Sequence, residues 1–333
     1  MNGYFLNVIL SGVNHAGPKA KRDVSTILYN DGMGEIYVDS EQSKWEKRLF
    51  FSHDLKYKLS QANDSDIFLA QYPFQMGRYA SYQIIKQITS KYQNNIILIH
   101  DIESLRNQSD KTTVAKEIGK FNHFKFVISH NDKMKQWLKE NGCTSEIVSL
   151  GLFDYLGPKL ESKKTGNYQR VFFAGNLEKS GFLYNDSVSS NYEVYGVGLQ
   201  NKKHQFNYRG VETPENLTKV LGKENGFGIV WEGNSTEHSS NYIKYNDPHK
   251  ASLYLFCKMP LVVWSQSALA DLVKNERLGL VVDNLEQASD LINNLSEEEY
   301  KEYQINTEKY GDRVRNGYFL NHALDEIKKS IKK

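Results

Sequence analysis

The segment at 245–256 carries the residues best suited to hold an anion. It reads Tyr-Asn-Asp-Pro-His-Lys-Ala-Ser-Leu-Tyr-Leu-Phe and predicts the start of a buried helix, with Asn246 or Asp247 as N-cap and Pro248 in the first turn. A helix N-terminus presents unpaired backbone N–H groups and a positive dipole end, and Lys250 adds a full charge there. We predict a phosphate or diphosphate site at Lys250. The alternative is a capped core helix whose polar residues only face solvent.

A second polar loop reads His-Asp-Ile-Glu-Ser-Leu-Arg at 100–106 and follows a predicted strand. Charged side chains at a strand end are costly to bury without partners. We interpret this loop as a site for an incoming hydroxyl group. Asp101 is the candidate general base, and His100, Glu103 and Arg106 would position the acceptor. The alternative is an edge loop that is polar by chance.

Two glycine-containing loops also follow predicted strands. The loop at 11–18 contains Gly12 and Gly17, which permit tight turns and a close approach of the backbone to a ligand, but it is not a GxGxxG fingerprint. The loop at 175–179 opens with Gly-Asn and places Lys179 in the following turn, which suits an anionic group. For both loops the alternative is a plain surface turn.

The sequence predicts no metal site. Asp64 and Asp66 form an Asp-x-Asp pair, but they precede the predicted strand at 67–71 and so lie at the end opposite a ligand site. The nine histidines show no metal-ligand spacing. Cys143 and Cys257 have no Cys-x-x-Cys spacing either, and we expect two buried thiols in a reducing compartment.

The predicted secondary structure around these loops alternates between strand and helix. In the first half, short apolar runs predict strands at 4–10, 35–38, 67–71, 95–100, 125–129 and 145–150. In the second half they predict strands at 171–174, 192–195, 227–231, 261–264 and 278–282. Helical patterns occur between most of them, for example at 79–92, 131–141, 214–221 and 248–256. This cadence is typical of doubly wound parallel sheets.

The predicted fold is therefore α/β, with two Rossmann-like domains and an interdomain cleft. The expected boundaries are 1–153 for the first domain, 154–168 for a polar linker, 169–315 for the second domain and 316–333 for a terminal helix. We expect that helix to pack toward the first domain through one apolar face, formed by Leu320, Leu324, Ile327 and Ile331.

Composition excludes several classes of protein. A net charge of +2, from 42 basic and 40 acidic residues, argues against a dedicated nucleic-acid binder. No apolar stretch approaches the ~20 residues of a membrane-spanning helix, and no signal peptide is evident, so we expect a cytoplasmic protein. The 21 Tyr and 16 Phe exceed the usual needs of a core and leave homo-oligomerisation open.

The chain resembles bacterial two-domain glycosyltransferases of the GT-B type over essentially its whole length. Within them it is similar to the third glucosyltransferase of serine-rich-repeat adhesin glycosylation and to β-1,6-galactofuranosyltransferases of capsule and O-antigen loci. The segments that carry the resemblance are AGPKAKRD at 16–23, HDIESLR at 100–106, FFAGN at 172–176 and YNDPHKASLYL at 245–255.

The resemblance implies roles for particular residues. The second domain would hold a UDP-sugar, with Lys250 and the N–H groups after it at the diphosphate, Lys179 nearby and Tyr208 bordering the nucleotide. Asn14 and Gly17 would close over the donor from the first domain. The remaining residues that the resemblance assigns to the donor are Asn176, Tyr245, Asp247, His249 and Ala251. Lys179 stands where part of the family has Arg, and it lacks the bidentate fork of Arg.

The expected activity is inverting, metal-independent transfer of a hexose, with glucose as first choice, from a UDP-sugar to a GlcNAc-modified serine-rich-repeat adhesin. In this interpretation Lys250 is catalytic because it stabilises the leaving UDP, and Asp101 is catalytic as the base. No cofactor is expected. The alternatives are a galactofuranosyltransferase acting on a surface-polysaccharide precursor and a non-catalytic partner in glycosylation.

Overall fold

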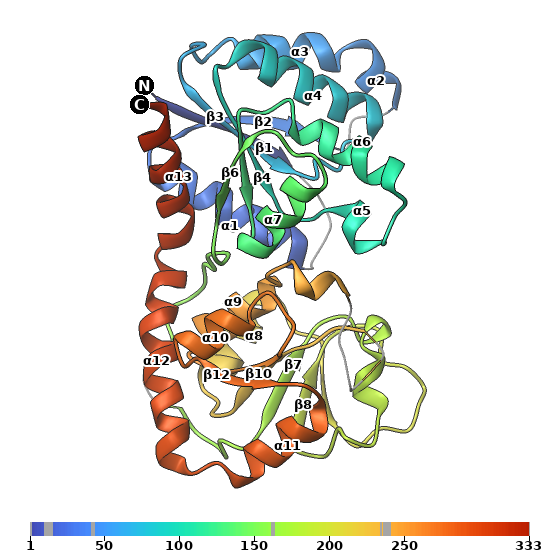
Figure 1. Ribbon diagram of the computed structural model, residues 1–333, viewed down its shortest axis with the longest axis vertical. Coiled ribbons are helices and arrows are strands. Elements are labelled where there is room, and N and C mark those ends of the chain that lie inside the picture. Colours follow the sequence, from blue (N-terminus) through green and yellow to red (C-terminus); the bar gives the residue numbers. More distant parts are fainter. Residues whose placement is uncertain are drawn as a thin grey trace. The chain divides into compact units, whose positions relative to one another are not determined.

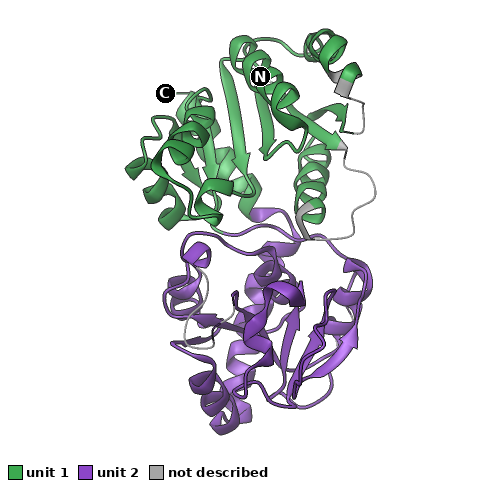
Figure 2. Cartoon of the chain, turned by 90° about the vertical axis from the view of Figure 1, so that its right-hand side faces the viewer, with its two compact units in different colours: residues 1–151, 319–333 green, residues 152–318 purple. Residues whose placement is uncertain are grey.

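The computed structural model describes residues 2–9, 16–40, 44–160, 164–233, 235 and 241–332. The chain forms two compact units, residues 1–151 with 319–333 and residues 152–318 (Figure 2). Each unit contains a six-stranded sheet whose paired strands are all parallel. The predicted α/β class with two Rossmann-like sheets is confirmed.

The sheet of the first unit has the order β2-β1-β3-β4-β5-β6 (Figure 1). Its strands are β1 (Gly3–Ile9), β2 (Gly34–Asp39), β3 (Ile67–Tyr72), β4 (Asn94–Ile99), β5 (Phe126–Ser129) and β6 (Glu146–Ser149). The strands β3, β4 and β5 are buried along their whole length. Such continuous apolar runs are typical of parallel strands that are covered on both faces.

The helices of the first unit join these strands. They are α1 (Ala16–Asn30), α2 (Lys44–Leu49), α3 (Phe51–Leu59), α4 (Gly77–Lys91), α5 (Glu103–Arg106), α6 (Lys111–Phe121), α7 (Asp132–Glu140) and the terminal α13 (Tyr318–Ile331). The residues from Phe319 onward belong to this unit, and Leu320, Leu324 and Ile327 are buried while Ile331 is half-buried. The apolar face that the periodicity of the sequence indicates is thus the face that α13 buries.

The sheet of the second unit has the order β12-β11-β10-β7-β8-β9. Its strands are β7 (Val171–Ala174), β8 (Tyr192–Tyr195), β9 (Asn207–Gly210), β10 (Phe227–Val230), β11 (Leu261–Trp264) and β12 (Gly279–Val282). The short strand β9 was not predicted, because its sequence Asn-Tyr-Arg-Gly is polar and has no apolar run.

The second unit contains five α-helices in its described residues, and one of them was not predicted. The helices are α8 (Pro214–Gly222), α9 (His249–Phe256), α10 (Ala270–Asn275), α11 (Leu285–Asn294) and α12 (Glu297–Arg315), with short 3-10 turns η1 (Leu177–Lys179), η2 (Gly181–Tyr184) and η3 (Asn241–Lys244). The missed helix, α12, begins with a capping box in which Ser296 and Glu299 exchange hydrogen bonds. That local signal was available in the sequence.

The end of the predicted first domain and the start of the predicted linker are tied into the second unit. Ser252 Oγ donates to the carbonyl of Phe153 (2.6 Å), and the N–H of Tyr155 donates to the carbonyl of Val314 (3.0 Å). Leu152, Phe153 and Tyr155 are all buried. The unit boundary in the structure falls between Gly151 and Leu152.

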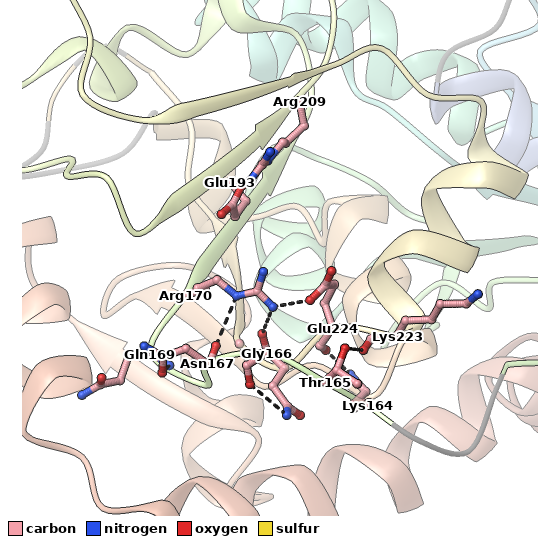
Figure 3. Close-up of polar contacts among 12 residues, drawn as sticks. Lys164, Thr165, Gly166, Asn167, Gln169, Arg170, Glu193, Arg209, Lys223 and Glu224 are labelled. Carbon is pink, nitrogen blue, oxygen red and sulfur yellow. Dashed lines mark hydrogen bonds and ion pairs between the residues drawn. The ribbon is translucent and has the colours of Figure 1, made fainter.

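A polar network anchors the start of β7 at the amino end of that strand (Figure 3). Arg170 forms an ion pair with Glu224, and the N–H of Thr165 donates to the carbonyl of Lys223 (2.7 Å). The Nδ2 of Asn225 donates to the carbonyl of Gly166 (3.2 Å). Because these residues precede β7 and β10, the network holds the amino ends of the two central strands and has a structural role.

Candidate active site

The strand order of the second unit defines where a ligand can bind. From β7 the chain steps outward to β8 and β9, and it then crosses to the other side of β7 to form β10, β11 and β12. The order therefore reverses between β7 and β10. In open α/β sheets, ligands bind beyond the carboxyl ends of the strands at such a switch point.

Lys250 lies at this switch point. Its Nζ donates to the carbonyl of Trp231, directly after β10, at 3.3 Å, and it lies 4.8 Å from the ring centre of Phe173 in β7. A methyl group on Gly175, directly after β7, would be 4.0 Å from the same Nζ. The ammonium group is thus held between the carboxyl ends of the two central strands.

The start of α9 differs by one or two residues from the prediction. Pro248, and not Asn246 or Asp247, is the N-cap, with φ −63° and ψ 134°, and the helix begins at His249. The sequence rule favours a side chain that can accept a hydrogen bond as the N-cap. Here Asn246 and Asp247 are buried before the helix begins, and no side chain caps it.

The environment of Lys250 makes it a poorly solvated cation. Burial lowers the pKa of Lys250, and the carboxylate of Glu232 partly opposes that shift. A lowered lysine pKa means that the site stabilises the charged ammonium less well than water does. An anionic ligand at this place would restore that stabilisation, which is the electrostatic condition for a phosphate site.

The loops after β7 and β8 cross closely beside Lys250. Gly196 has φ +142°, and a Cβ there would lie 1.7 Å from the carbonyl oxygen of Gly175. Only glycine permits this approach. Tyr208 Oη donates to the carbonyl of Gly196 (2.9 Å), so this predicted nucleotide neighbour supports the crossing. Gly196 was not predicted as a site residue, although it follows a strand, as Gly12 and Gly175 do.

The predicted residues of the β7 loop lie on the surface at the same edge. Asn176 caps η1, because its Oδ1 accepts a hydrogen bond from the N–H of Glu178 (2.9 Å). Asn176 and Lys179 are both exposed. They are accessible to a ligand, whereas Lys250 is half-buried.

Other residues of the predicted donor segment pack within the unit. The imidazole of His249 stacks on Tyr155, with ring centres 4.8 Å apart. Asp247 and Ala251 are buried and Tyr245 is half-buried. The N–H of Ala251 donates to the carbonyl of Pro248 (2.8 Å), so this amide is already used. Of this segment, Lys250 has the side chain best placed to meet an anion.

In the first unit, the loop after β4 holds a carboxylate and a guanidinium together. Asp101 Oδ2 accepts from Arg106 Nη1 at 2.6 Å, with side chains 17% and 53% exposed. His100 Nε2 is hydrogen-bonded to Oε1 of Gln71 in β3 at 2.8 Å. The structure therefore brings Asp101 and Arg106 together and ties His100 to the neighbouring strand. Glu103 is exposed at the start of α5.

Glu117, which the sequence analysis did not select, fixes this loop. Its carboxylate is buried and accepts hydrogen bonds from the N–H groups of Ser104 (2.7 Å) and Glu103 (3.3 Å). It also accepts from Tyr72 Oη at 2.7 Å. A carboxylate at the first N–H groups of α5 fits both the hydrogen-bonding need and the dipole. The loop that carries Asp101 thus has a rigid support.

The segment after β1 is only partly described. Asn14 lies outside the described residues, and Gly17 belongs to the first turn of α1. Farther along α1, Lys19 Nζ and Asp23 form a buried ion pair at 2.6 Å. Lys21 Nζ donates to the carbonyl of Pro73, and burial lowers the pKa of Lys21 to about 8. Lys21 thus lies where the strand order of this sheet reverses, between β1 and β3, and it was not predicted as a site residue.

His130 lies directly after β5, and we expect it to make the protein less stable in mild acid. Burial is the main cause that lowers its pKa to about 4, and the charge of Arg106 contributes. Below pH 6.5, the usual pKa of histidine, His130 is protonated in the unfolded chain but stays neutral in the folded chain. The free energy of unfolding therefore falls as the pH drops from 6.5 toward 4. Between pH 6.5 and 5 this amounts to about 1.6 kcal/mol.

The check is urea unfolding of the protein and of His130→Gln at a series of pH values. The variant should be less dependent on pH over this interval, whatever its absolute stability. An identical pH slope in both proteins would contradict the assignment. The comparison stops at pH 5 because carboxylates dominate the titration below that value.

The Asp-x-Asp pair has structural partners. The carboxylate of Asp66 is buried and accepts from the N–H groups of Asn2 and Asn63, both at 2.9 Å. Asp64 lies 3.5 Å from Lys91 Nζ. Within the described ranges, no three His, Cys, Asp or Glu side chains form a group suited to a metal ion. Cys143 and Cys257 are free and buried, as predicted.

Solved structures share this two-unit fold. Sucrose-phosphate synthase from Thermosynechococcus elongatus matches with a TM-score of 0.65 at 10% identity, covering 99% of both chains. The Anabaena protein HepE, solved with UDP and glucose, matches with a TM-score of 0.64 at 11% identity over 99% of this chain and 100% of that one. The fold is that of the two-domain GT-B glycosyltransferases.

Sequence comparison then gives the family. The N-terminal domain of the glucosyltransferase 3-like family matches residues 3–152, and the C-terminal domain of that family matches residues 171–327. The chain belongs to the glucosyltransferase 3-like family and is a glycosyltransferase. It is 27% identical to the β-1,6-galactofuranosyltransferase WbbI of Escherichia coli K12 over 99% of both chains. It is also 27% identical to glucosyltransferase 3 of Streptococcus gordonii over 92% of both.

Proposed function

We propose that this enzyme transfers a hexose, with glucose as first choice, from a UDP-sugar to a GlcNAc-modified serine-rich-repeat adhesin, with inversion and without a metal. The observation that carries the proposal is the position of the half-buried residue Lys250, whose ammonium group lies at the switch point between β7 and β10. Glucosyltransferase 3 of Streptococcus gordonii, similar over most of its length, supports the choice of glucose.

In the proposed chemistry, Lys250 acts on the leaving group and Asp101 acts on the acceptor. The bond between the anomeric carbon of the donor and the phosphate oxygen breaks, and the electron pair leaves with UDP. Lys250 compensates the negative charge that develops there, and one preorganised donor of this kind contributes about 3 kcal/mol. The acceptor hydroxyl forms the new bond to the anomeric carbon and gives its proton to Asp101. A single displacement from the opposite face inverts the configuration.

The cation at the leaving group makes a divalent ion unnecessary in this proposal. Lys179, exposed on the β7 loop, would assist at the diphosphate, and Asn176 and Tyr208 would border the nucleotide. Arg106 and His100 would orient the acceptor beside Asp101. We place the reaction in the cytoplasm, because Cys143 and Cys257 are unpaired thiols.

A second candidate within the same chemistry is galactofuranose transfer to a cell-surface polysaccharide precursor. It is favoured by the similarity to WbbI, which extends over 99% of both chains. The two candidates share the leaving group and differ in the sugar ring and the acceptor.

Calorimetric and thermal-shift titrations with UDP, GDP, UDP-glucose and UDP-galactofuranose, all in EDTA, test the proposal. We expect only the uridine nucleotides to bind, and a ligand at 100 times its dissociation constant should stabilise the protein by about 2.7 kcal/mol. Tighter binding of UDP-galactofuranose than of UDP-glucose would select the second candidate. If the nucleotides bind only after a divalent ion is added, the metal-free mechanism is excluded. If none of them binds at all, the result favours a non-catalytic partner in glycosylation over a transferase.

A further inference from the structure

The helices α2, α3 and α4 of the first unit, with the residue that joins α2 to α3, expose several large apolar side chains. The exposed residues are Trp45, Leu49, Phe50, Tyr57, Tyr79 and Tyr82, which we call the aromatic patch. Trp45 is 73% and Tyr57 72% exposed, and each of the six is at least 39% exposed. Single exposed apolar residues are common on soluble proteins, whereas groups of them on adjacent helices are typical of interaction surfaces.

The patch follows from the helical periodicity of these segments. In α4, Ala80, Ile84 and Ile88 are buried against the core, so Tyr79 and Tyr82 lie on the opposite face. In α3, residues Phe51, Leu55 and Leu59 are buried, which directs Tyr57 outward. In α2 the described side chains of Trp45, Arg48 and Leu49 are all exposed. This short helix therefore turns apolar side chains toward solvent.

The three helices are packed on one another. They lie together in Figure 1, and α2 and α3 each contact α4. Ser52 Oγ is hydrogen-bonded to Gln83 Oε1 (3.1 Å), and Gln87 Nε2 donates to the carbonyl of Ser52 (2.9 Å). These bonds hold α3 against the middle of α4. The aromatic patch is therefore carried by packed helices.

Charge identifies the kind of partner. The sequences of α2, α3 and α4 contain eight Lys or Arg residues and two acidic residues, although the whole chain has a net charge of only +2. One of the acids, Asp54, is paired with Lys58 at 2.9 Å. The cations Arg48, Lys56, Arg78 and Lys86 are exposed. The positive charge of the chain is concentrated on the helices that expose the aromatic rings.

We propose that this surface binds the face of an anionic lipid bilayer. Exposed Trp, Leu and Phe beside Lys and Arg suit the interface of a membrane, where the apolar groups enter the headgroup layer and the cations meet lipid phosphates. A second copy of the chain fits less well, because a symmetric contact would bring two strongly positive surfaces together. Within the described ranges, no helix is long and apolar enough to span a membrane.

The test is co-sedimentation of the full chain with vesicles of phosphatidylcholine alone and of phosphatidylcholine mixed with phosphatidylglycerol. The protein should sediment with the mixed vesicles only, and the binding should weaken with added salt. Each cation contributes about fivefold to the partition coefficient, so Arg78→Glu with Lys86→Glu should lower it by about 25-fold or more. Trp45→Ser with Leu49→Ser and Phe50→Ser should release the protein even at low salt.

Matched controls lie in the second unit. Lys219→Glu with Lys309→Glu reverses two exposed cations, and Ile305→Ser removes an apolar side chain that is 54% exposed. These variants should bind as the parent does, and all variants should melt near the parent temperature because the changed side chains are exposed. The proposal is overturned if the parent stays in the supernatant, or if the controls lose binding equally.

Two further results would assign the surface to another partner and overturn the proposal. Without vesicle binding, a parent that is dimeric by light scattering and a triple serine variant that is monomeric would identify a second copy. Binding to polyglutamate but not to vesicles would identify an acidic protein segment. Nucleotide titration of the same variants keeps this result separate from the donor site.

Discussion

Replacing Lys250 by alanine should weaken UDP binding by about 10- to 100-fold, because a hydrogen bond to a charged group contributes about 1.5–3 kcal/mol. The Nζ of Lys250 is held between the carboxyl ends of β7 and β10, where the sheet order reverses. A diphosphate bound there would lose its ion pair and keep its other contacts. Calorimetric titration of the variant with UDP measures the loss directly.

The fold should tolerate this change. Burial lowers the pKa of Lys250, so the ammonium group is held at a cost in solvation, and its removal should leave the melting temperature close to that of the parent. The control is Lys219→Ala, an exposed cation on α8 whose loss should not affect UDP binding. Equal UDP affinity in the Lys250 variant and the parent would remove Lys250 from the donor site.

The pH dependence gives a second measure of the same residue. A bound diphosphate favours the charged form of Lys250, whereas burial lowers its pKa in the free protein. Affinity for UDP should therefore fall as the pH rises through this lowered pKa. The fall should begin at a lower pH than it would for a lysine in contact with water. The alanine variant should not show this decline.

Replacing Asp101 by asparagine should separate chemistry from donor binding. The substitution keeps the shape of the side chain and removes the group that would take the proton of the acceptor. We expect the transfer rate to fall by about 10²- to 10⁴-fold, the usual contribution of a general base, with UDP affinity unchanged. Rates measured at saturating donor and acceptor, beside a UDP titration, give both quantities.

The neighbouring carboxylate provides the matched control for Asp101. Glu103 is exposed in the same loop, and Glu103→Gln should retain most of the activity if Asp101 is the base. The ion pair to Arg106 is half exposed on the arginine side, so its loss should affect stability little. A Glu103 variant as inactive as the Asp101 variant, or an Asp101 variant with full activity, would move the role of base elsewhere.

The class of fold and the segments that carry the candidate site could be predicted from the amino-acid sequence. Continuous apolar runs separated by amphipathic stretches identify both parallel sheets, since such strands are buried on both faces. Lys250 follows a helix-start signal, and Asp101 follows the apolar run of β4. These signals are local, because spacing and residue type within a few positions encode them.

Which distant residues complete each segment could be read only from the folded chain. The carboxylate of Glu117 supports the Asp101 loop, and Tyr72, which donates to it, is 45 residues away along the chain. The partner of Lys250 is the carbonyl of Trp231, and the close approach at Gly196 involves a loop after another strand. Such pairs depend on the order of the strands in each sheet, which is β2-β1-β3-β4-β5-β6 in one unit and β12-β11-β10-β7-β8-β9 in the other. Strand order arises from the packing of the whole chain, so no local pattern contains it.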